Sequence, residues 1–281
     1  MNSISLKCNA KINLSLDVIG KREDGYHNIE LVFLEINLAD EVTVSLRDDG
    51  NIKLICNDPT LPSDDKNIAY KAAALFFSEY GKNYGADIIL KKNIPHGAGL
   101  AGGSADAAGV LKALNILLSE PFSKEKLMRL GTKLGADVPF CILGGCAFAE
   151  GIGDILTPLP KPDGLYYVLV KPEQSISTAY VYQNLDLNKR PDTLNVKNVV
   201  NAIKSNDKNA FYKYAGNIME TVTASKFPII NKIKETLIKN GSKKALMSGS
   251  GTTVFGIFES LSTAKNVAEL LKKEYKNVYL A

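Results

Sequence analysis

A glycine-rich segment that runs directly into a strongly amphipathic stretch constrains this chain of 281 residues more than any other feature. The segment is Pro95–Ser104, with the sequence PHGAGLAGGS. Over 104–118, apolar side chains recur at helical spacing, which predicts an amphipathic helix. Glycines let a backbone approach a ligand closely, and a helix N-terminus attracts phosphate through its free N–H groups. With Ser104 as the expected N-cap, the pattern favours a phosphate-binding loop over a merely flexible one.

Three known kinds of glycine loop fit this segment poorly. Gly97, Gly99 and Gly102 satisfy G-x-G-x-x-G, but a Rossmann loop requires a strand that runs straight into the first glycine. Here the residues 93–96 intervene, and the pattern after the helix predicts another helix. A Walker A loop requires lysine where Gly103 stands, and the H-R-D and D-F-G sequences of protein kinases do not occur. The segment is therefore a phosphate loop of another kind, or no phosphate loop at all.

Composition excludes several classes of protein. Hydrophobic residues make up 45% and charged residues 23%, as in an average globular protein, so a disordered chain, a coiled coil and a collagen-like chain are excluded. The sequence has no run of about 18 apolar residues that could cross a bilayer. The net charge of +4 fits anionic small molecules, and the dispersed basic residues argue against nucleic-acid binding.

The cysteines and the N-terminal sequence predict a cytoplasmic protein. Four scattered cysteines without a C-x-x-C pair indicate reduced thiols rather than a zinc site or disulfides. The first residues show neither a charged head followed by an apolar block nor a long leader rich in serine and arginine. We therefore expect neither secretion nor import into an organelle.

The order of the expected elements predicts an α+β protein. Strands are expected at 12–18, 29–36, 41–46, 52–56, 86–92, 165–170 and 277–280, with a further strand pair around 247–258. Helices are expected at 67–80, 104–118, 124–134 and 262–274, with several more after 170. Strands cluster early and do not alternate regularly with helices, which favours α+β over a doubly wound sheet. The proline-rich stretch 158–164 predicts a boundary between domains 1–157 and 158–281.

Two charged residues could take part in chemistry. Lys11 lies on the same face as Asn13 of a strand expected to be half-buried, where polar side chains are usually solvated. Asp137 stands among apolar residues after a helix that ends at a glycine, so its carboxylate either caps a turn or is partly buried with a partner. If the two meet, they form a structural salt bridge, or a base and the cation that tunes it.

Two further segments look suited to ligands. Tyr26 and His27 follow a tight turn, and an aromatic ring beside an imidazole could grip a flat heterocycle, or could be an ordinary exposed pair. The patch Met247–Gly256, MSGSGTTVFG, is too long and too rich in hydroxyl groups for a two-residue hairpin. A second loop that faces a ligand is the better interpretation.

In order along the chain, these patches resemble the motifs of the GHMP kinase superfamily. The motifs are Lys11–Asn13, Pro95–Ser104 and Ser248–Gly256, and together they span nearly the whole sequence. Asp24–His27 and Gly135–Phe140 are similar to the markers of the branch that acts on a cytidyl diphosphate alcohol. The resemblance implies a two-lobed α+β fold, with an N-terminal lobe like domain 2 of ribosomal protein S5 and a ferredoxin-like C-terminal α/β sandwich. It also implies transfer of the γ-phosphoryl group of ATP to an alcohol.

The resemblance assigns roles residue by residue. Asp137 matches the catalytic base, and Lys11 matches the partner that orients or polarises the same hydroxyl. Tyr26 would stack on one face of the cytosine and Tyr182 on the other face, with Tyr180, two residues away, as the alternative. The residues that match substrate-binding positions are Asn13, Tyr26, His27, Tyr182, Ser248 and Gly249. Those that match ATP-binding positions are Asn67, Lys92, Pro95, Gly97, Gly99, Leu100, Ala101, Gly102, Gly103 and Ser104.

The segment also departs from the family pattern. His96 and Ala101 stand where an apolar residue and a glycine are expected, and Ala105 replaces a common second serine. The nearby Asp106 could contribute a ligand for Mg²⁺, or simply favour the helix dipole. Mg²⁺ is expected because a polyphosphate needs charge neutralisation, but the sequence identifies no metal ligand. The expected partners are ATP and a small alcohol, without nucleic acid or membrane, in a monomer or homodimer.

Three other functions remain open. A GHMP kinase for another alcohol, such as mevalonate or homoserine, would have no flat base for Tyr26 and His27 to bind. An NAD-dependent oxidoreductase would use the same glycine pattern. A catalytically silent relative is disfavoured because Lys11 and Asp137 are present.

Overall fold

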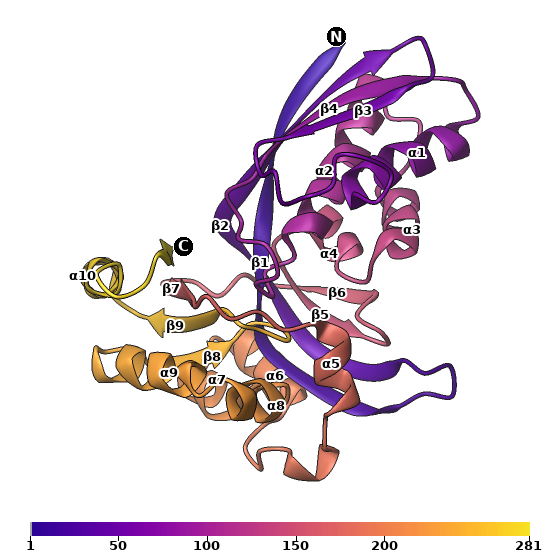
Figure 1. Cartoon of the computed structure of the whole chain (residues 1–281). Coiled ribbons are helices and arrows are strands. Elements are labelled where there is room, and N and C mark those ends of the chain that lie inside the picture. Colours follow the sequence, from indigo (N-terminus) through magenta and orange to yellow (C-terminus); the bar gives the residue numbers. More distant parts are fainter. Residues whose placement is uncertain (1) are drawn as a thin grey trace. The chain divides into compact units, whose positions relative to one another are not determined.

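The computed structural model describes residues 2–281, which separate into two compact units. The first unit comprises the residues up to Ala10, Glu35–His96 and Ala101–Gly144. The second comprises Lys11–Leu34, Gly97–Leu100 and Gly145–Ala281. The two long strands β1 (Ser3–Lys21) and β2 (His27–Arg47) each contribute residues to both units (Figure 1). The α+β class expected from the sequence is confirmed.

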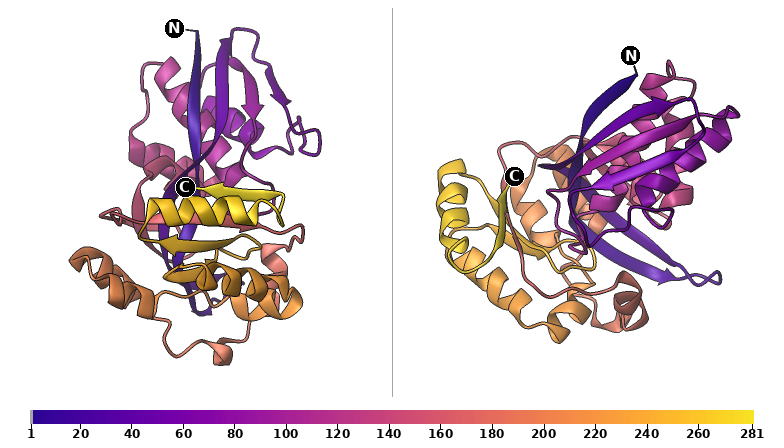
Figure 2. Two further views of the ribbon diagram at one scale, coloured as in Figure 1. Left: turned by 90° about the vertical axis from the view of Figure 1, so that its left-hand side faces the viewer. Right: turned by 45° about the horizontal axis from the view of Figure 1, so that its top comes forward.

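In the first unit, four helices cover one face of a sheet. The second half of β2 pairs antiparallel with β4 (Gly85–Lys91), and β4 pairs parallel with β3 (Ile52–Cys56). The helices are α1 (Ile68–Tyr80), α2 (Gly102–Leu117), α3 (Lys124–Leu134) and α4 (Val138–Leu143). Figures 1 and 2 show these helices on the same side of the strands. Alternate residues of β4 follow this arrangement, since Ile88 and Leu90 are buried while Ile89 is 49% exposed.

The second unit contains a small antiparallel sheet with a ferredoxin-like topology (Figure 2). Its strand order is β10-β7-β9-β8, in the chain order strand, helices, strand, strand, helix, strand. The strands are β7 (Tyr166–Lys171), β8 (Lys244–Met247), β9 (Val254–Phe258) and β10 (Asn277–Leu280). The helices after β7 are α5 (Thr178–Gln183), the 3₁₀ turn Leu187–Lys189, α6 (Val196–Ser205), α7 (Lys208–Tyr214), α8 (Glu220–Lys226), α9 (Ile229–Lys239) and, after β9, α10 (Leu261–Leu271).

The sheet that contains β3 and β4 has six strands and runs through β2, which also pairs with β1. The first half of β2 pairs antiparallel with β5 (Cys146–Glu150), which pairs antiparallel with β6 (Ile155–Leu159). Pro158 lies within β6, so the proline-rich stretch begins inside a strand. Its remaining residues lead into β7.

Three expectations from the sequence are wrong. The stretches 29–36 and 41–46 form the single strand β2 rather than two strands. The central part of β1 is buried on both faces. Residues 216–218 hydrogen-bond to the Ser15 hydroxyl and the Leu16 backbone, and Gly99 and Ser248 contact Lys11 and Asn13. The polar residues buried there are Lys11, Asn13, Ser15 and Asp17. Ser104 is not an N-cap, because α2 begins two residues earlier, after Ala101.

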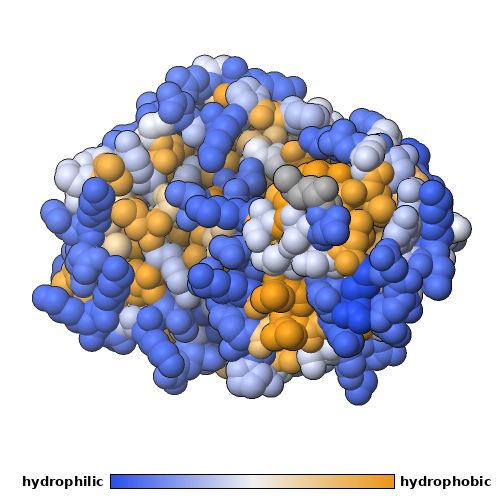
Figure 3. Space-filling model, turned by 90° about the horizontal axis from the view of Figure 1, so that it is seen from above, coloured by the Kyte–Doolittle hydropathy of each residue, from blue (hydrophilic) through white to orange (hydrophobic). Residues whose placement is uncertain are grey.

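The surface of the molecule carries both polar and apolar side chains. On the face shown in Figure 3, hydrophilic side chains are spread widely and hydrophobic ones form patches between them. Across residues 2–281, the helices are too short or too polar to cross a bilayer. Cys8 and Cys146 are buried, and Cys56 and Cys141 are half-buried.

Candidate functional site

In the second unit, a buried lysine binds the glycine-rich segment. The Nζ atom of Lys11 donates to Asn13 Oδ1 at 2.9 Å and to the carbonyl of Gly99 at 3.1 Å. The ammonium also lies 5.4 Å from the ring centroid of Phe33. Lys11 is only 4% exposed, so contacts with the protein, these among them, set its position rather than solvent. We call Lys11, Asn13, Gly99 and Ser248 the Lys11 cluster.

Gly99 makes this close approach possible. Its φ is +74°, in the region that favours glycine, and a Cβ atom there would lie 2.2 Å from the carbonyl oxygen of Ser248. Backbone hydrogen bonds hold the same segment, from Lys11 N–H to the carbonyl of Leu100 and from Thr253 N–H to the carbonyl of Ala98. The glycines expected to bring backbone close to a ligand also bring it close to β1.

The third glycine patch packs against the same lysine. Ser248 is fully buried, and its hydroxyl donates to the Gly99 carbonyl at 2.9 Å. Gly249 has a φ of +57°, and a Cβ atom there would lie 3.6 Å from Lys11 Nζ. The segment 248–253 is a connection between β8 and β9 rather than a two-residue hairpin. It lies directly beside Lys11, Asn13 and Gly99.

Aromatic side chains meet elsewhere in the second unit. The rings of His27 and Tyr182 stack, with centroids 4.9 Å apart and an angle of 19° between their planes. Burial, and then the charge of Lys21, lower the pKa of His27, so its ring is neutral near pH 7. Tyr26 is 62% exposed, and Tyr180 lies under the ammonium of Lys226, 3.7 Å from the ring centroid. The structure therefore brings together His27 and Tyr182 among the residues predicted to bind cytosine.

In the first unit, the glycine-rich segment enters α2. Ala101 occupies the N-cap position with a φ of +59°, a left-handed conformation that glycine adopts more readily. This conformation gives a physical reason for the glycine that the family pattern leads us to expect there. A Cβ atom on Gly102 would lie 3.4 Å from Lys92 Nζ, and one on Gly103 would lie 3.4 Å from Ile68. Ser104 is half-buried in the first turn of α2.

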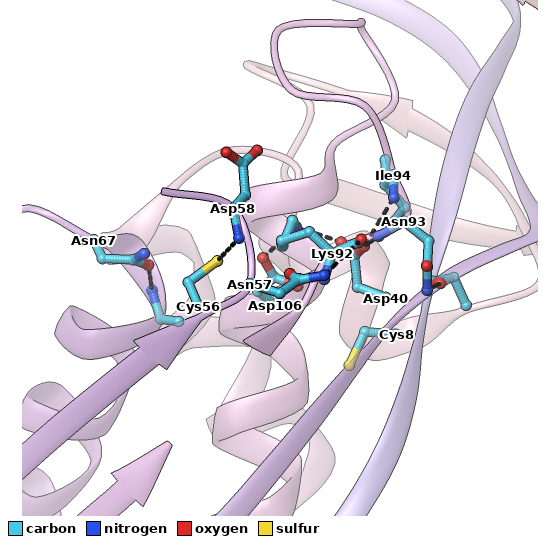
Figure 4. Close-up of polar contacts among 12 residues, drawn as sticks. Cys8, Asp40, Cys56, Asn57, Asp58, Asn67, Lys92, Asn93, Ile94 and Asp106 are labelled. Carbon is cyan, nitrogen blue, oxygen red and sulfur yellow. Dashed lines mark hydrogen bonds and ion pairs between the residues drawn. The ribbon is translucent and has the colours of Figure 1, made fainter. Parts of the chain in front are cut away.

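A second lysine, whose side chain is only 8% exposed, lies beneath the start of α2. Lys92 Nζ donates to one carboxylate oxygen of Asp40 and to one of Asp106 (Figure 4). The other oxygen of Asp40 accepts the backbone N–H groups of Asn93, at 2.5 Å, and Ile94, at 2.8 Å. We call Lys92, Asp40 and Asp106 the Lys92 cluster. Asp40 thereby holds the backbone that leads into Pro95.

Burial governs the protonation of the Lys92 cluster. It raises the pKa of Asp106 to about 7, with the charge of Asp40 adding to this effect and that of Lys92 opposing it. Burial also acts to lower the pKa of Lys92, but the two carboxylates outweigh it and the pKa is raised. The other oxygen of Asp106, Oδ1, is buried and has no hydrogen-bond partner among the described residues. Lys92 is therefore a firmly charged cation between two acidic groups.

The remaining predicted residues of the first unit have local roles. Asn67 is the N-cap of α1, where its Oδ1 accepts Ala69 N–H at 2.9 Å and its Nδ2 donates to the carbonyl of Pro62 at 2.7 Å. Asp137 directly precedes α4 and is half-buried, and its side chain does not cap that helix. Lys11 and Asp137 fall in different units, so their predicted meeting stays a prediction.

Sequence reasoning missed two residues that hold these clusters. Asp40 lies inside β2, where the sequence places a break between two strands. Asn217 lies more than 200 residues after Lys11, yet its side chain binds the backbone on both sides of Ser248. Asp40 offered one signal, as an acidic residue in an otherwise strand-like stretch, whereas nothing local to Asn217 predicts its contacts.

Comparison with known proteins identifies both halves of the chain. The family model described as "GHMP kinases N terminal domain" matches residues 67–145, and "GHMP kinases C terminal" matches residues 199–277. A 4-diphosphocytidyl-2-C-methyl-D-erythritol kinase of Acetivibrio thermocellus is 48% identical over 97% of this chain and 96% of its own length. A crystal structure of 4-(cytidine 5'-diphospho)-2C-methyl-D-erythritol kinase is 33% identical with a TM-score of 0.82, covering 99% of this chain and 98% of that one. A homoserine kinase from Cytophaga hutchinsonii, 22% identical with a TM-score of 0.81 over 100% of this chain and 95% of its own, shares the fold.

Proposed function

Because the chain belongs to the GHMP kinases, and within them to the 4-diphosphocytidyl-2-C-methyl-D-erythritol kinase family, we propose that it phosphorylates the 2-hydroxyl of 4-diphosphocytidyl-2-C-methyl-D-erythritol. It is an ATP-dependent kinase with an alcohol group as acceptor. The reaction belongs to the non-mevalonate route to isoprenoid precursors. The identity of 48% over nearly the whole chain favours this substrate over mevalonate or homoserine, whereas the homoserine kinase of known structure shares the fold at 22% identity.

The observation that carries the proposal is the Lys11 cluster. A buried ammonium whose place is fixed by an amide oxygen and a glycine carbonyl is the preorganised positive charge that phosphoryl transfer requires. The glycine-rich segment is held against the same lysine by Ser248. In this proposal Lys11 orients the acceptor hydroxyl, and Asn13, Ser248 and Gly249 place the alcohol part of the substrate.

Asp137 is the proposed base. Its carboxylate would take the proton of the 2-hydroxyl while that oxygen forms a bond to the γ-phosphorus of ATP. The bond between the γ-phosphorus and the β–γ bridging oxygen breaks in the same displacement, and ADP leaves with the electron pair. Half-buried in front of α4, Asp137 keeps enough exposure to meet a substrate.

The nucleotide is assigned to the glycine-rich segment and its neighbours. Backbone N–H groups from Gly97 to Ser104 would bind the phosphates, and the first turn of α2 would add its dipole. Asn67 and Lys92 would lie near the adenosine part. Their side chains hold α1 and the Lys92 cluster, so we propose that they shape this region rather than donate to the base directly.

The cytosine is assigned to the aromatic pair of the second unit. The centroids of the His27 and Tyr182 rings are 4.9 Å apart. A cytosine inserted between two parallel rings would need their centroids to be about 7 Å apart, so it cannot enter between these two rings as they stand. We therefore propose that His27 leaves Tyr182 when the substrate binds and donates or accepts at the polar edge of the cytosine. Tyr26, exposed beside it, would cover the other face of the base.

Mg²⁺ would supply charge neutralisation of the phosphates. No three acidic, histidine or cysteine side chains gather into a metal site within residues 2–281. The buried Oδ1 of Asp106 is a free acceptor, but Lys92 already binds the other oxygen of that carboxylate. We propose that Mg²⁺ binds together with ATP, held by the phosphates and by most of its own water molecules. No residue of this chain is assigned as its ligand.

Other properties follow the same proposal. We place the enzyme in the cytoplasm, as a monomer or homodimer that binds small molecules. The division of the GHMP lobes at 157/158 is part of the proposal.

An ADP-release assay with Mg-ATP and a panel of alcohols tests this function. The panel holds the cytidyl substrate, mevalonate, homoserine and galactose, and turnover of the cytidyl compound alone is expected. Turnover of another alcohol would overturn the substrate assignment, and failure to use any of them while binding ATP would overturn the kinase. Asp137→Asn should retain the fold and ATP affinity while kcat falls by about 10²–10⁴-fold. Near-normal turnover would refute its role as base.

A further inference from the structure

A buried asparagine holds the turn that follows β8. Asn217 is 3% exposed, and its Nδ2 donates to the carbonyls of Met247 and Gly249, each at 2.8 Å. Its Oδ1 accepts the backbone N–H of Met219 at 2.9 Å, which fixes the orientation of the amide. The side chain therefore grips the residues immediately before and after Ser248.

The turn held in this way touches the Lys11 cluster. Ser248 donates to the same Gly99 carbonyl that Lys11 Nζ binds, and Gly249 lies directly beside that ammonium. A second support comes from Glu220, whose Oε1 accepts Met247 N–H at 2.7 Å. A shift of the turn would therefore move the carbonyl that orients Lys11.

We propose that Asn217 is a positioning residue for phosphoryl transfer. By fixing the two carbonyls around Ser248, it sets the Gly99 carbonyl and, through that carbonyl, the Lys11 ammonium. The inference rests on the proposed role of Lys11 in the kinase reaction. A misplacement of about 1 Å in such an arrangement can reduce a rate about 10²-fold.

The variant Asn217→Asp distinguishes a role in positioning Lys11 from a role in stability alone. The ionised aspartate has no N–H group for either carbonyl, and burial raises the pKa of such a carboxyl. Its protonated form can donate one O–H, which restores part of the grip. The kcat of the folded variant relative to the wild type should therefore rise as the pH falls, whereas a loss of stability alone would change only the fraction of enzyme that is folded.

Asn115 provides the matched control. It is 7% exposed, and its side chain likewise bridges backbone, donating to the carbonyl of Phe122 and accepting Phe122 N–H, each at 3.0 Å. It lies in α2 of the first unit, outside the Lys11 cluster. Asn115→Asp should lower stability while kcat and its pH profile follow the wild type.

The experiment measures kcat and KM between pH 6 and 9, and amide hydrogen exchange over 247–253, for the wild type and both variants. Asn217→Asp should lower kcat about 10–100-fold at pH 8 and speed exchange in that turn, with a smaller change in the KM for ATP. Asn217→Ser, which is uncharged, replaces it if the aspartate prevents folding, and should lower kcat without the pH effect.

Two results would overturn the inference. One is a kcat for the Asn217 variant that matches that of Asn115→Asp, and the other is unchanged exchange over 247–253. Failure of the wild type to phosphorylate the cytidyl substrate would refute the proposed function instead. In that case the exchange rates still decide whether Asn217 holds the turn.

Discussion

The Lys11 and Lys92 clusters place two buried lysines in different chemical surroundings. Lys92 binds two carboxylates, from Asp40 and Asp106. Lys11 binds an amide oxygen and a backbone carbonyl. The Lys92 ammonium joins two buried carboxylates that would repel each other without it, whereas the Lys11 ammonium holds the glycine-rich segment against β1. Burial alone therefore does not assign a role to a lysine, and the segments that it joins do.

The largest effect on stability is expected from Lys92→Met. The substitution leaves Asp40 and Asp106 buried side by side without their cation, which should lower the free energy of unfolding by about 3–5 kcal/mol. Urea denaturation at pH 8 measures it. Lys126→Met is the control, because the Lys126–Glu79 pair is about one-third exposed and should be worth less than about 1 kcal/mol. Equal losses for the two variants would refute the structural role of Lys92.

Lys11→Met should act on the rate instead. Loss of a preorganised cation beside the acceptor hydroxyl is expected to lower kcat by about 10²–10³-fold. Lys171→Met removes a similarly buried lysine that donates to the carbonyls of Pro172 and Gln174. Steady-state kinetics should show that kcat responds at Lys11 far more than at Lys171. Parallel losses of kcat would show that the two lysines have the same role.

The pH dependence of stability distinguishes the Lys92 cluster from the Lys11 cluster. The pKa of Asp106 is about 7 in the folded protein and near 3.9 in an unfolded chain. Between these two pH values the carboxyl of Asp106 holds a proton in the folded state that the unfolded state has lost. The contribution of Asp106 to the free energy of unfolding is therefore full below pH 4 and is lost as the pH rises through 7. Asp106→Asn has no such proton. Its unfolding free energy, measured in urea from pH 4 to 8, should rise relative to that of the wild type. Parallel curves would contradict the raised pKa.

The sequence predicts a cluster less well when its residues lie far apart along the chain. The bounds of α3 and β10 agree with the sequence pattern because local periodicity determines them. The burial of Asn13 and Ser15 was wrongly predicted, because the residues that cover them, Ser248 and Gly216, lie more than 200 residues away along the chain. Asp40 and Asn217 act through contacts of the same long-range kind. A single sequence identifies the residues that carry chemistry more readily than those that position them.

The smallest expected effect is on the free energy of unfolding, and it has opposite signs at two positions of the glycine-rich segment, Ala101 and Gly99. Ala101 has a φ of +59°, which costs an alanine about 1 kcal/mol, so Ala101→Gly should raise the unfolding free energy by about that amount. Asn206→Gly is the control, because Asn206 has a φ of +55° and asparagine tolerates this region better, which predicts a smaller gain. Gly99→Ala should have the opposite sign, since its Cβ would lie 2.2 Å from the Ser248 carbonyl oxygen. Thermal and urea unfolding of the three variants measure these differences. A loss of stability in Ala101→Gly would mean that the left-handed turn before α2 is not strained. The cost of a side chain in this segment would then arise only at Gly99, where the backbone packs against the Lys11 cluster.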